Sequence, residues 1–376
     1  MEAITSLYFH IPFCASRCIY CGFYSTTLSE LQNRYVDALI REIEMRRHDD
    51  TISTIYLGGG TPSQLTHENL LKLFRAIYKV YSVADDAEIT MECNPDDIKK
   101  GMFQDLPVNR VSMGAQTFSD NRLRFLRRQH RAKEVDYAVK TLHDDGIHNI
   151  SIDLMFGFPE ETLDDWRADI MHALRLMPTH ISAYGLMYEE GTALYKLREQ
   201  GKIEEIDEEL SLKMYSELTN HLKEAGYEHY EISNFALPGY RSRHNSSYWN
   251  NTPYIGIGAA AHSYDTGNEI TKQPATRSWN VADIRQYMQT IEQGRRPSEQ
   301  ETIGADTYYN DLVMTALRTC EGISLKMLSS KYRKFLLNNA SSYISQGKLV
   351  VKNEHLKLTQ KGINISNTIM SDLMKV

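Results

Sequence analysis

Three of the five cysteines in the chain, Cys14, Cys18 and Cys21, lie within eight residues. Their spacing, C-x3-C-x2-C, brings three thiolates together, and thiolates prefer soft metal centres. A 4Fe-4S cluster usually takes four protein ligands, so three cysteines would leave one iron open. The other two, Cys93 and Cys320, stand alone in the sequence, and we expect them to be small buried hydrophobic residues.

Three other interpretations of the cysteines stay open at this point. A zinc site would pair C-x2-4-C with a second Cys or His pair, and no such pair follows. A redox C-x-x-C formed by Cys18 and Cys21 would leave Cys14 unexplained. Three incidental buried thiols are the last possibility, although free cysteines seldom cluster without a reason. The spacing therefore favours an iron–sulfur cluster.

Residues able to bind a ligand recur close to predicted strand ends. Gly58-Gly59-Gly60-Thr61-Pro62 can form a tight turn whose backbone approaches a ligand closely. The turn is neither a dinucleotide fingerprint nor a P-loop, because no G-x-G-x-x-G opens a helix and the P-loop Lys is missing. Glu92, Gln116 and Asp153 can accept hydrogen bonds, and Arg128 can pair with a carboxylate, although solvated polar groups are common at such positions.

These residues need a scaffold, and the first half of the chain alternates strand-like and helix-like segments. Helices are predicted over Leu28–Met45, over Glu68–Tyr81 with Thr66 as N-cap, and over Glu208–Gly226. The alternation predicts βα units around a parallel sheet, with the site at the carboxyl ends of the strands. Six strands are predicted: Ser6–Phe9, Ile52–Leu57, Glu88–Met91, Arg110–Met113, Ile150–Leu154 and His180–Tyr184.

The cysteine motif resembles that of the radical S-adenosylmethionine (SAM) enzymes. The longer string from Tyr8 to Cys21, Y-x-H-x-P-F-C-x3-C-x2-C, is similar to the branch that contains oxygen-independent coproporphyrinogen III oxidases and HemW-type haem chaperones. The resemblance implies an α/β fold with a partial (β/α)6 barrel and a 4Fe-4S cluster on the three cysteines. It also implies SAM on the open iron, where an electron from the cluster cleaves it to a 5′-deoxyadenosyl radical.

The same resemblance implies a set of SAM-binding residues, with the glycine-rich turn facing the amino group of SAM. No residue is assigned a catalytic role. The implied SAM contacts are Tyr8, Gly59, Gly60, Thr61, Glu92, Gln116, Arg128 and Asp153.

An aromatic-rich segment follows, between residues 227 and 297. Its rings can simply pack over the barrel, or they can form a platform for a large planar ligand. The string H-N-x-x-Y-W within it resembles the signature of HemW-type haem chaperones. That resemblance implies haem ligation by His244, with Tyr248 and Trp249 as stacking walls. Another of the 13 histidines could serve as the ligand instead.

A composition shift near Gly294–Ser298 predicts a domain boundary, which divides the chain into residues 1–226, 227–297 and 298–376. The last part resembles a small winged-helix domain, as this family has. Counted from Ala305, ten Lys or Arg against five Asp or Glu raise the possibility of DNA binding, but the charges are scattered and no recognition helix is strongly basic. We expect this domain to cover part of the site. Its predicted elements are helices Ala305–Arg318, Leu325–Ser330 and Phe335–Gln346, strands Lys348–Val351 and Leu356–Leu358, and a last helix, Lys361–Met374, capped by Thr359.

Bulk composition narrows the function classes. The net charge of −7 argues against a dominant nucleic-acid or membrane-surface role. The sequence shows no apolar run of about 18 residues and no secretory signal. Because cluster thiolates need a reducing compartment, we expect a cytoplasmic protein, peripheral at the inner face of the membrane through its partner.

Two features depart from the coproporphyrinogen oxidases. Phe23 stands where those oxidases carry a further cysteine, and only seven residues precede Tyr8, where they have a longer arm. The sequence therefore predicts a HemW-like haem chaperone without oxidase activity, which delivers haem to a respiratory haem protein. Its expected partners are that acceptor and a reductant such as a flavodoxin or ferredoxin, with the chain as a monomer or homodimer. The alternatives are a coproporphyrinogen III oxidase, acting by radical decarboxylation, and an iron–sulfur sensor.

Overall fold

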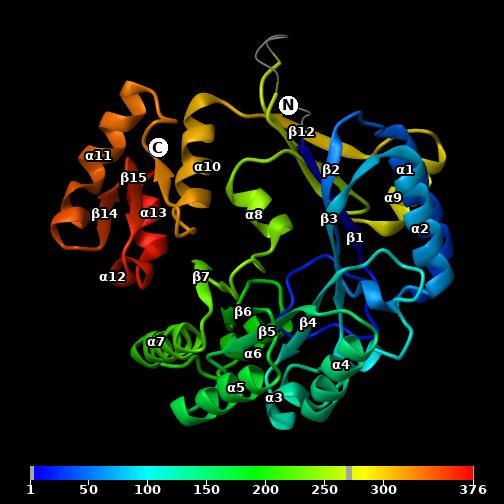
Figure 1. Cartoon of the computed structure of the whole chain (residues 1–376), viewed down its shortest axis with the longest axis horizontal. Helices are drawn as coiled ribbons and strands as arrows, with labels where there is room; N and C mark the ends of the chain where they lie inside the picture. Colours follow the sequence, from blue (N-terminus) through cyan, green and yellow to red (C-terminus); the bar gives the residue numbers. More distant parts are fainter. Residues whose placement is uncertain (1–3, 268–272, 376) are drawn as a thin grey trace.

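The computed structural model describes residues 4–267 and 273–375. Its centre is a sheet of twelve strands in the order β12-β11-β10-β9-β1-β2-β3-β4-β5-β6-β8-β7. The six strands from β1 to β6 are parallel neighbours and contain all six predicted strands. Since β12 and β7 are its two edges, the barrel is open, as the fold prediction implied (Figure 1). These strands are β1 (Ile4–Ile11), β2 (Thr51–Gly59), β3 (Ser82–Cys93), β4 (Arg110–Gln116), β5 (Asn149–Phe156) and β6 (His180–Gly185).

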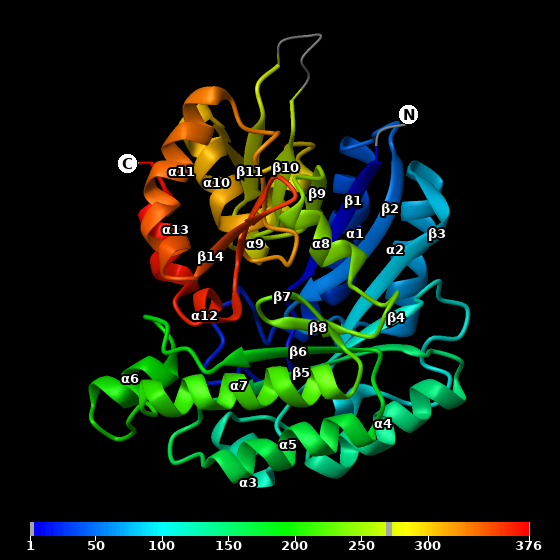
Figure 2. The same cartoon turned by 60° about the vertical axis from the view of Figure 1, so that its left-hand side comes forward.

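Helices cover one face of the parallel strands. Leu7 and Phe9 of β1 point to this face and are fully buried in the same core as Tyr35 and Leu39 of α1. Thr66 caps α2 as predicted, since its hydroxyl accepts a hydrogen bond from the Asn69 N–H over 3.2 Å. Figure 2 shows α5 and α7 side by side beneath β5 and β6. The helices of this layer are α1 (Gln32–Met45), α2 (His67–Val80), α3 (Asp120–Phe125), α4 (Ala132–Asp144), α5 (Leu163–Arg175) and α7 (Glu208–Glu224).

The opposite face of the same strands is polar. Successive side chains of a strand point to opposite faces, and along these strands the apolar residues alternate with polar ones. Tyr56 follows Ile55, Glu92 follows Met91, and the apolar member of each pair enters the helix-covered core. The inner face therefore carries residues that can hydrogen-bond a ligand. They include Tyr8, His10, Thr54, Tyr56, Glu88, Glu92, Arg110, Ser112, Asp153 and Ser182.

The aromatic-rich segment extends both edges of the parallel sheet. β7 (Glu228–Glu231) and β8 (Asn234–Ala236) continue beyond β6, whereas β9 (Tyr254–Ile257) joins β1 at the other edge. Between these strands the short helix α8 (Arg243–Trp249) crosses the inner face and contacts β2.

The strands beyond β9 are antiparallel. β10 (His262–Asp265), β11 (Thr276–Asn280) and β12 (Ser298–Thr302) complete the large sheet, and α9 (Ile284–Glu292) packs against α1. Because β12 hydrogen-bonds to β11, it lies within the large sheet, although the predicted boundary grouped it with the C-terminal domain.

The C-terminal unit has its own three-stranded sheet, β13-β15-β14, and its own core. Figure 1 shows it on the far side of α8 from α1 and α2. The order of its elements agrees with a winged-helix-like domain. They are α10 (Ala305–Ala316), β13 (Ile323–Ser324), α11 (Ser330–Ser345), β14 (Leu349–Lys352), β15 (His355–Leu358), α12 (Gln360–Ile363) and α13 (Ser366–Leu373).

Two details of the C-terminal prediction were wrong. Leu325–Ser330 is not a helix, because the Leu325 N–H bonds to the Glu354 carbonyl at the β14–β15 turn. The last helix is broken into α12 and α13 near Ile365, whose φ of −126° and ψ of 30° leave the helical region. Thr359 nevertheless caps α12, accepting from the Gly362 N–H over 3.3 Å. In the part of the chain described, no helix has the length and apolar character needed to cross a bilayer.

Candidate cofactor site

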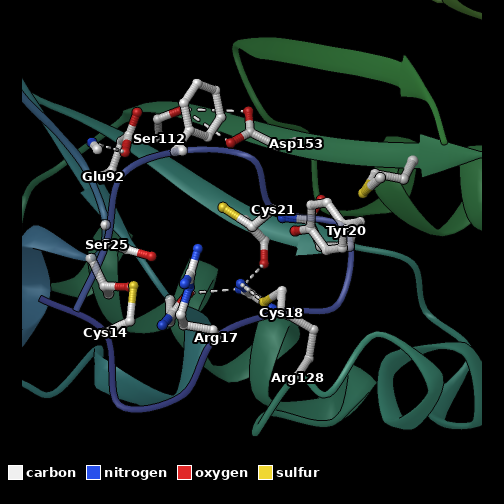
Figure 3. A pocket seen from close by; sticks show the side chains of 18 of the residues that line it. Cys14, Arg17, Cys18, Tyr20, Cys21, Ser25, Glu92, Ser112, Arg128 and Asp153 are labelled. Carbon is white, nitrogen blue, oxygen red and sulfur yellow. Dashed lines mark hydrogen bonds between the residues drawn. The ribbon is translucent and has the colours of Figure 1, made fainter. Parts of the chain in front are cut away.

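A cavity of about 580 Å³ opens at the carboxyl ends of the parallel strands. All three clustered cysteines line it, and so do seven of the eight predicted SAM contacts. Tyr8 is the exception and lies behind the cavity wall. We call residues 12–26 the cysteine loop. Figure 3 shows residues from this loop, β3, β4 and β5 around the same space. The predicted contacts in the wall are Gly59, Gly60, Thr61, Glu92, Gln116, Arg128 and Asp153.

The cysteine loop leaves β1 and is fixed at both ends by backbone hydrogen bonds. The Cys14 N–H bonds to the Thr26 carbonyl over 2.9 Å, and the Thr26 N–H returns to the Pro12 carbonyl over 2.7 Å. In the middle of the loop the Ile19 N–H reaches the Leu126 carbonyl over 3.3 Å. The loop therefore holds three free, half-exposed thiols at the edge of the cavity.

The thiols fit a multi-iron cluster better than a single metal ion. Within residues 4–267 and 273–375, no three His, Cys, Asp or Glu side chains gather around a single ion position. A 4Fe-4S cluster distributes its thiolates over separate irons, so its ligands need not converge on one point. Burial raises the pKa of the Cys14 and Cys21 thiols, so a cationic centre is needed to hold them as thiolates.

The glycine-rich turn packs directly on the cysteine loop. Gly59 has a φ of +110°, and a Cβ atom there would lie 2.5 Å from the His10 ring. A Cβ atom on Gly60 would lie 2.6 Å from the Pro12 carbonyl carbon. The Thr61 N–H also bonds to the Phe13 carbonyl over 2.7 Å. These glycines therefore allow the turn to pack closely on His10 and Pro12 of the same chain. The turn also forms part of the cavity wall.

Two half-buried carboxyl groups, those of Glu92 and Asp153, face the cavity. Glu92 accepts from the Tyr56 hydroxyl over 2.8 Å and from the Gly59 N–H over 3.0 Å. Burial raises the pKa of Glu92 to about 7 and that of Asp153 to about 6. Asp153 accepts from the Ser112 hydroxyl over 3.3 Å. Both carboxyl groups can accept further hydrogen bonds, so an ammonium or hydroxyl group would find partners here.

Arg128 is held against both the cysteine loop and β4. Its Nη2 donates to Asn94 Oδ1 over 2.6 Å and to the Gly114 carbonyl over 2.7 Å, while Nη1 lies 3.7 Å from Cys18 Sγ. Its Nε is buried and has no partner in the described part of the chain. Gln116 ends β4 with a φ of +64° beside a register shift, which turns its side chain into the cavity wall.

Tyr8 supports the site from behind. Its hydroxyl lies 3.0 Å from His10 Nδ1, and His10 Nε2 lies 2.9 Å from the Tyr24 carbonyl. Its ring stacks on Tyr56 with centroids 6.2 Å apart. This chain of contacts links β1, β2 and the far end of the cysteine loop. Tyr56, Asn94 and Ser112 are among the wall residues that were not predicted from the sequence.

His244 lies on α8 and is buried, not in an open loop. Its Nδ1 lies 2.8 Å from Thr54 Oγ1, and its Nε2 lies 2.9 Å from the Tyr248 hydroxyl. Burial lowers its pKa to about 3, so the ring is neutral. Because both nitrogens have partners, the ring has no free nitrogen for iron in this arrangement. Trp249 lies under Arg318 of the C-terminal unit, 5.2 Å from its guanidinium carbon.

The isolated cysteines differ from each other. Cys93 is buried at the end of β3, as expected. Cys320 is exposed, so that expectation was wrong. It lies in the turn that joins α10 to β13, where its backbone N–H bonds to the Tyr230 carbonyl over 3.0 Å and leaves the side chain outside the core.

Comparison with known proteins places this site in a family. A model of the radical SAM superfamily matches residues 8–173, and a model of the HemN C-terminal domain matches residues 304–365. The chain is 36% identical to the heme chaperone HemW of Synechocystis over 337 residues, which cover 87% of this chain and 81% of that protein. It is 35% identical to the heme chaperone HemW of Bacillus subtilis, over 88% of each chain.

The chain belongs to the HemW family of the radical SAM superfamily. Membership in this superfamily implies a 4Fe-4S cluster and SAM. Among solved structures, coproporphyrinogen III oxidase (HemN) from Escherichia coli has the same fold, with a TM-score of 0.84 and 21% identity. That likeness covers 100% of this chain and 90% of the oxidase. The HemW-like H-N-x-x-Y-W segment lies between the two matched family models.

Proposed function

We propose that this HemW-family chain is a haem chaperone that binds a 4Fe-4S cluster, SAM and haem, and delivers haem to a respiratory haem protein. The observation that carries the proposal is the cavity in which the three cysteines meet the predicted SAM residues. The curated relatives named heme chaperones extend over most of the chain and support the choice of cargo.

In this proposal Cys14, Cys18 and Cys21 hold the cluster, and the rest of the cavity wall holds SAM. When bound, the cluster supplies an electron that can cleave SAM reductively. Glu92 and Asp153 would accept hydrogen bonds from the ammonium and hydroxyl groups of SAM. Gly59, Gly60 and Thr61 would shape the wall beside it, and Tyr8 would support the wall from behind.

Arg128 and Gln116 would complete the SAM site. The Arg128 guanidinium is oriented by Asn94 and the Gly114 carbonyl, and its unpaired Nε leaves a donor for a carboxylate. The Gln116 amide would contribute a neutral hydrogen-bonding group from the end of β4. Residues 1–226 would thus bind both cofactors, while the later parts of the chain would enclose the site and engage the partners.

An anaerobic assay tests the proposal against its main alternative. Cluster-loaded protein, SAM and a low-potential reductant such as reduced flavodoxin are incubated with coproporphyrinogen III. We expect no formation of protoporphyrinogen. In a second assay, haem-loaded protein is mixed with an apo-cytochrome, and we expect haem to move to it. Efficient decarboxylation without haem transfer would identify the chain as an oxidase instead, in keeping with its fold likeness to HemN.

A further inference from the structure

Large apolar side chains are exposed to solvent at the opening of the cofactor cavity. We call this opening, formed by Phe23, Met187, Arg17 and Arg127, the mouth. Phe23 is 70% exposed and Met187 is 61% exposed, and both line the cavity together with Tyr184 at the end of β6. The backbone of Gly22 lies against the side chain of Glu189, so the segments that carry Phe23 and Met187 are neighbours. Exposed apolar groups gathered at a cavity are typical of a ligand surface and not of a solvated edge.

Two cationic side chains besides Arg128 line the same cavity. Arg17 and Arg127 are both exposed. Ser16 joins their segments, because its hydroxyl donates to the Arg127 carbonyl over 3.5 Å and accepts from Gln129 Nε2 over 3.2 Å. Figure 3 shows Arg17 among the three cysteines. In residues 4–267 and 273–375, neither guanidinium has a hydrogen-bond or ion-pair partner, so both can bind an anion.

We propose that haem docks at this mouth, with its macrocycle against Phe23 and Met187 and its propionates toward Arg17 and Arg127. The inference rests on the proposed function, since it takes haem as the cargo. Haem is a flat apolar ring with two carboxylates on one edge, and the mouth offers apolar side chains together with unpaired guanidinium groups. By contrast, His244 in α8 is buried, and both of its ring nitrogens already have partners.

The test is a titration of the full, cluster-loaded chain with ferric haem, followed by Soret absorbance and by quenching of tryptophan fluorescence. We expect the double variant Phe23→Ser/Met187→Ser to raise the Kd for haem about tenfold or more, because it removes the apolar contact. The variants Arg17→Ala and Arg127→Asn should weaken binding less and should flatten its dependence on salt. Asn is chosen at Arg127 because the φ of +62° there suits it.

Matched controls separate this surface from general effects of exposed residues. Met327 is 62% exposed in the C-terminal unit, Tyr137 is 58% exposed on α4, and Arg285 is exposed on α9. The substitutions Met327→Ser, Tyr137→Ser and Arg285→Ala should leave the Kd unchanged.

The outcomes are distinct. If wild type binds no haem, the proposed function fails. If wild type binds haem and the mouth variants bind it equally well, the docking site is wrong while the chaperone function stands. Loss of binding in His244→Ala alone, in a variant that keeps wild-type circular dichroism, would place haem at α8 and overturn the inference.

Discussion

The Tyr56 hydroxyl donates a hydrogen bond to Glu92 Oε1 over 2.8 Å, at the wall of the cofactor cavity. The hydrogen bond favours the ionised carboxylate, but burial outweighs it and raises the Glu92 pKa to about 7. At neutral pH the group is therefore divided between its two forms, and a cationic ligand would shift it to the ionised one.

SAM binding should accordingly depend on pH. Because the ammonium group of SAM prefers ionised Glu92, we expect affinity to rise as the pH increases from about 6 to about 8, with release of a proton near pH 7. Titration calorimetry in two buffers with different ionisation enthalpies measures that proton. Glu92→Gln should bind SAM more weakly and release none. Asp153→Asn is the comparison variant. Because the pKa of Asp153 is about 6, removing this carboxyl group should leave the proton release near pH 7 in place. Equal proton release by wild type and Glu92→Gln would refute the role given to Glu92.

Cluster assembly should depend on Cys18. Its thiol lies in the fixed loop beside Arg128, and we expect Cys18→Ala to lose nearly all cluster iron and sulfide after anaerobic reconstitution. Cys320→Ala removes an exposed thiol that does not line the cavity, and this variant should keep both iron and sulfide. The measurement is iron and acid-labile sulfide per chain. A full complement in Cys18→Ala would contradict the cluster assignment.

The contact of the glycine turn with the cysteine loop can be tested at Gly59. Gly59→Ala places a methyl group against the His10 ring, so we expect a loss of about 2 kcal/mol or more in unfolding free energy and reduced cluster content. Gly191→Ala is matched, since Gly191 also has a positive φ, +89°, but a Cβ atom there meets nothing within 4 Å. Gly191→Ala should lose only about 1 kcal/mol of unfolding free energy, from the backbone strain at this position. Equal losses in both variants, measured by chemical denaturation, would mean that the packing on His10 contributes little.

The C-terminal unit is tied to the barrel by an ion pair between Arg318 and the buried Glu231, at 2.8 Å. Arg318→Ala leaves that carboxylate without its cation, and we expect a loss of about 3 kcal/mol, seen in urea denaturation. Fluorescence of Trp249, beneath Arg318, should change as well. Arg333→Ala breaks the exposed pair with Glu354 and should cost less than about 1 kcal/mol. A small loss in Arg318→Ala would indicate that this ion pair contributes little to holding the C-terminal unit on the barrel.

Much of the site could be predicted because it depends on local sequence patterns. The cysteine spacing and the polar residues near strand ends are properties of short segments, and parallel strands bring their carboxyl ends to one edge. Tyr56 and Ser112 were missed, although the alternation along β2 and β4 points both to the face that carries Glu92 and Asp153. That signal was available in the sequence.

The surroundings of His244 were not predictable in the same way. Its ring nitrogens contact Thr54, 190 residues earlier in the chain, and Tyr248, which shares its short helix. Such a contact exists only once α8 has docked on the inner face of β2, and nothing local to H-N-x-x-Y-W specifies that docking. The exposure of Cys320 likewise depends on where the C-terminal unit meets Tyr230.

The pairing of β1 has a consequence for how this protein is made. One edge of β1 pairs with β2, but the other pairs with β9, which begins at Tyr254. During synthesis the first strand therefore keeps an open edge until most of the chain has left the ribosome, and an open edge can pair with other chains. The cysteine loop follows this strand directly, so a nascent chain displays its three thiols before the sheet beside them is complete. We therefore expect the cluster to be inserted after translation, when β9 has closed that edge.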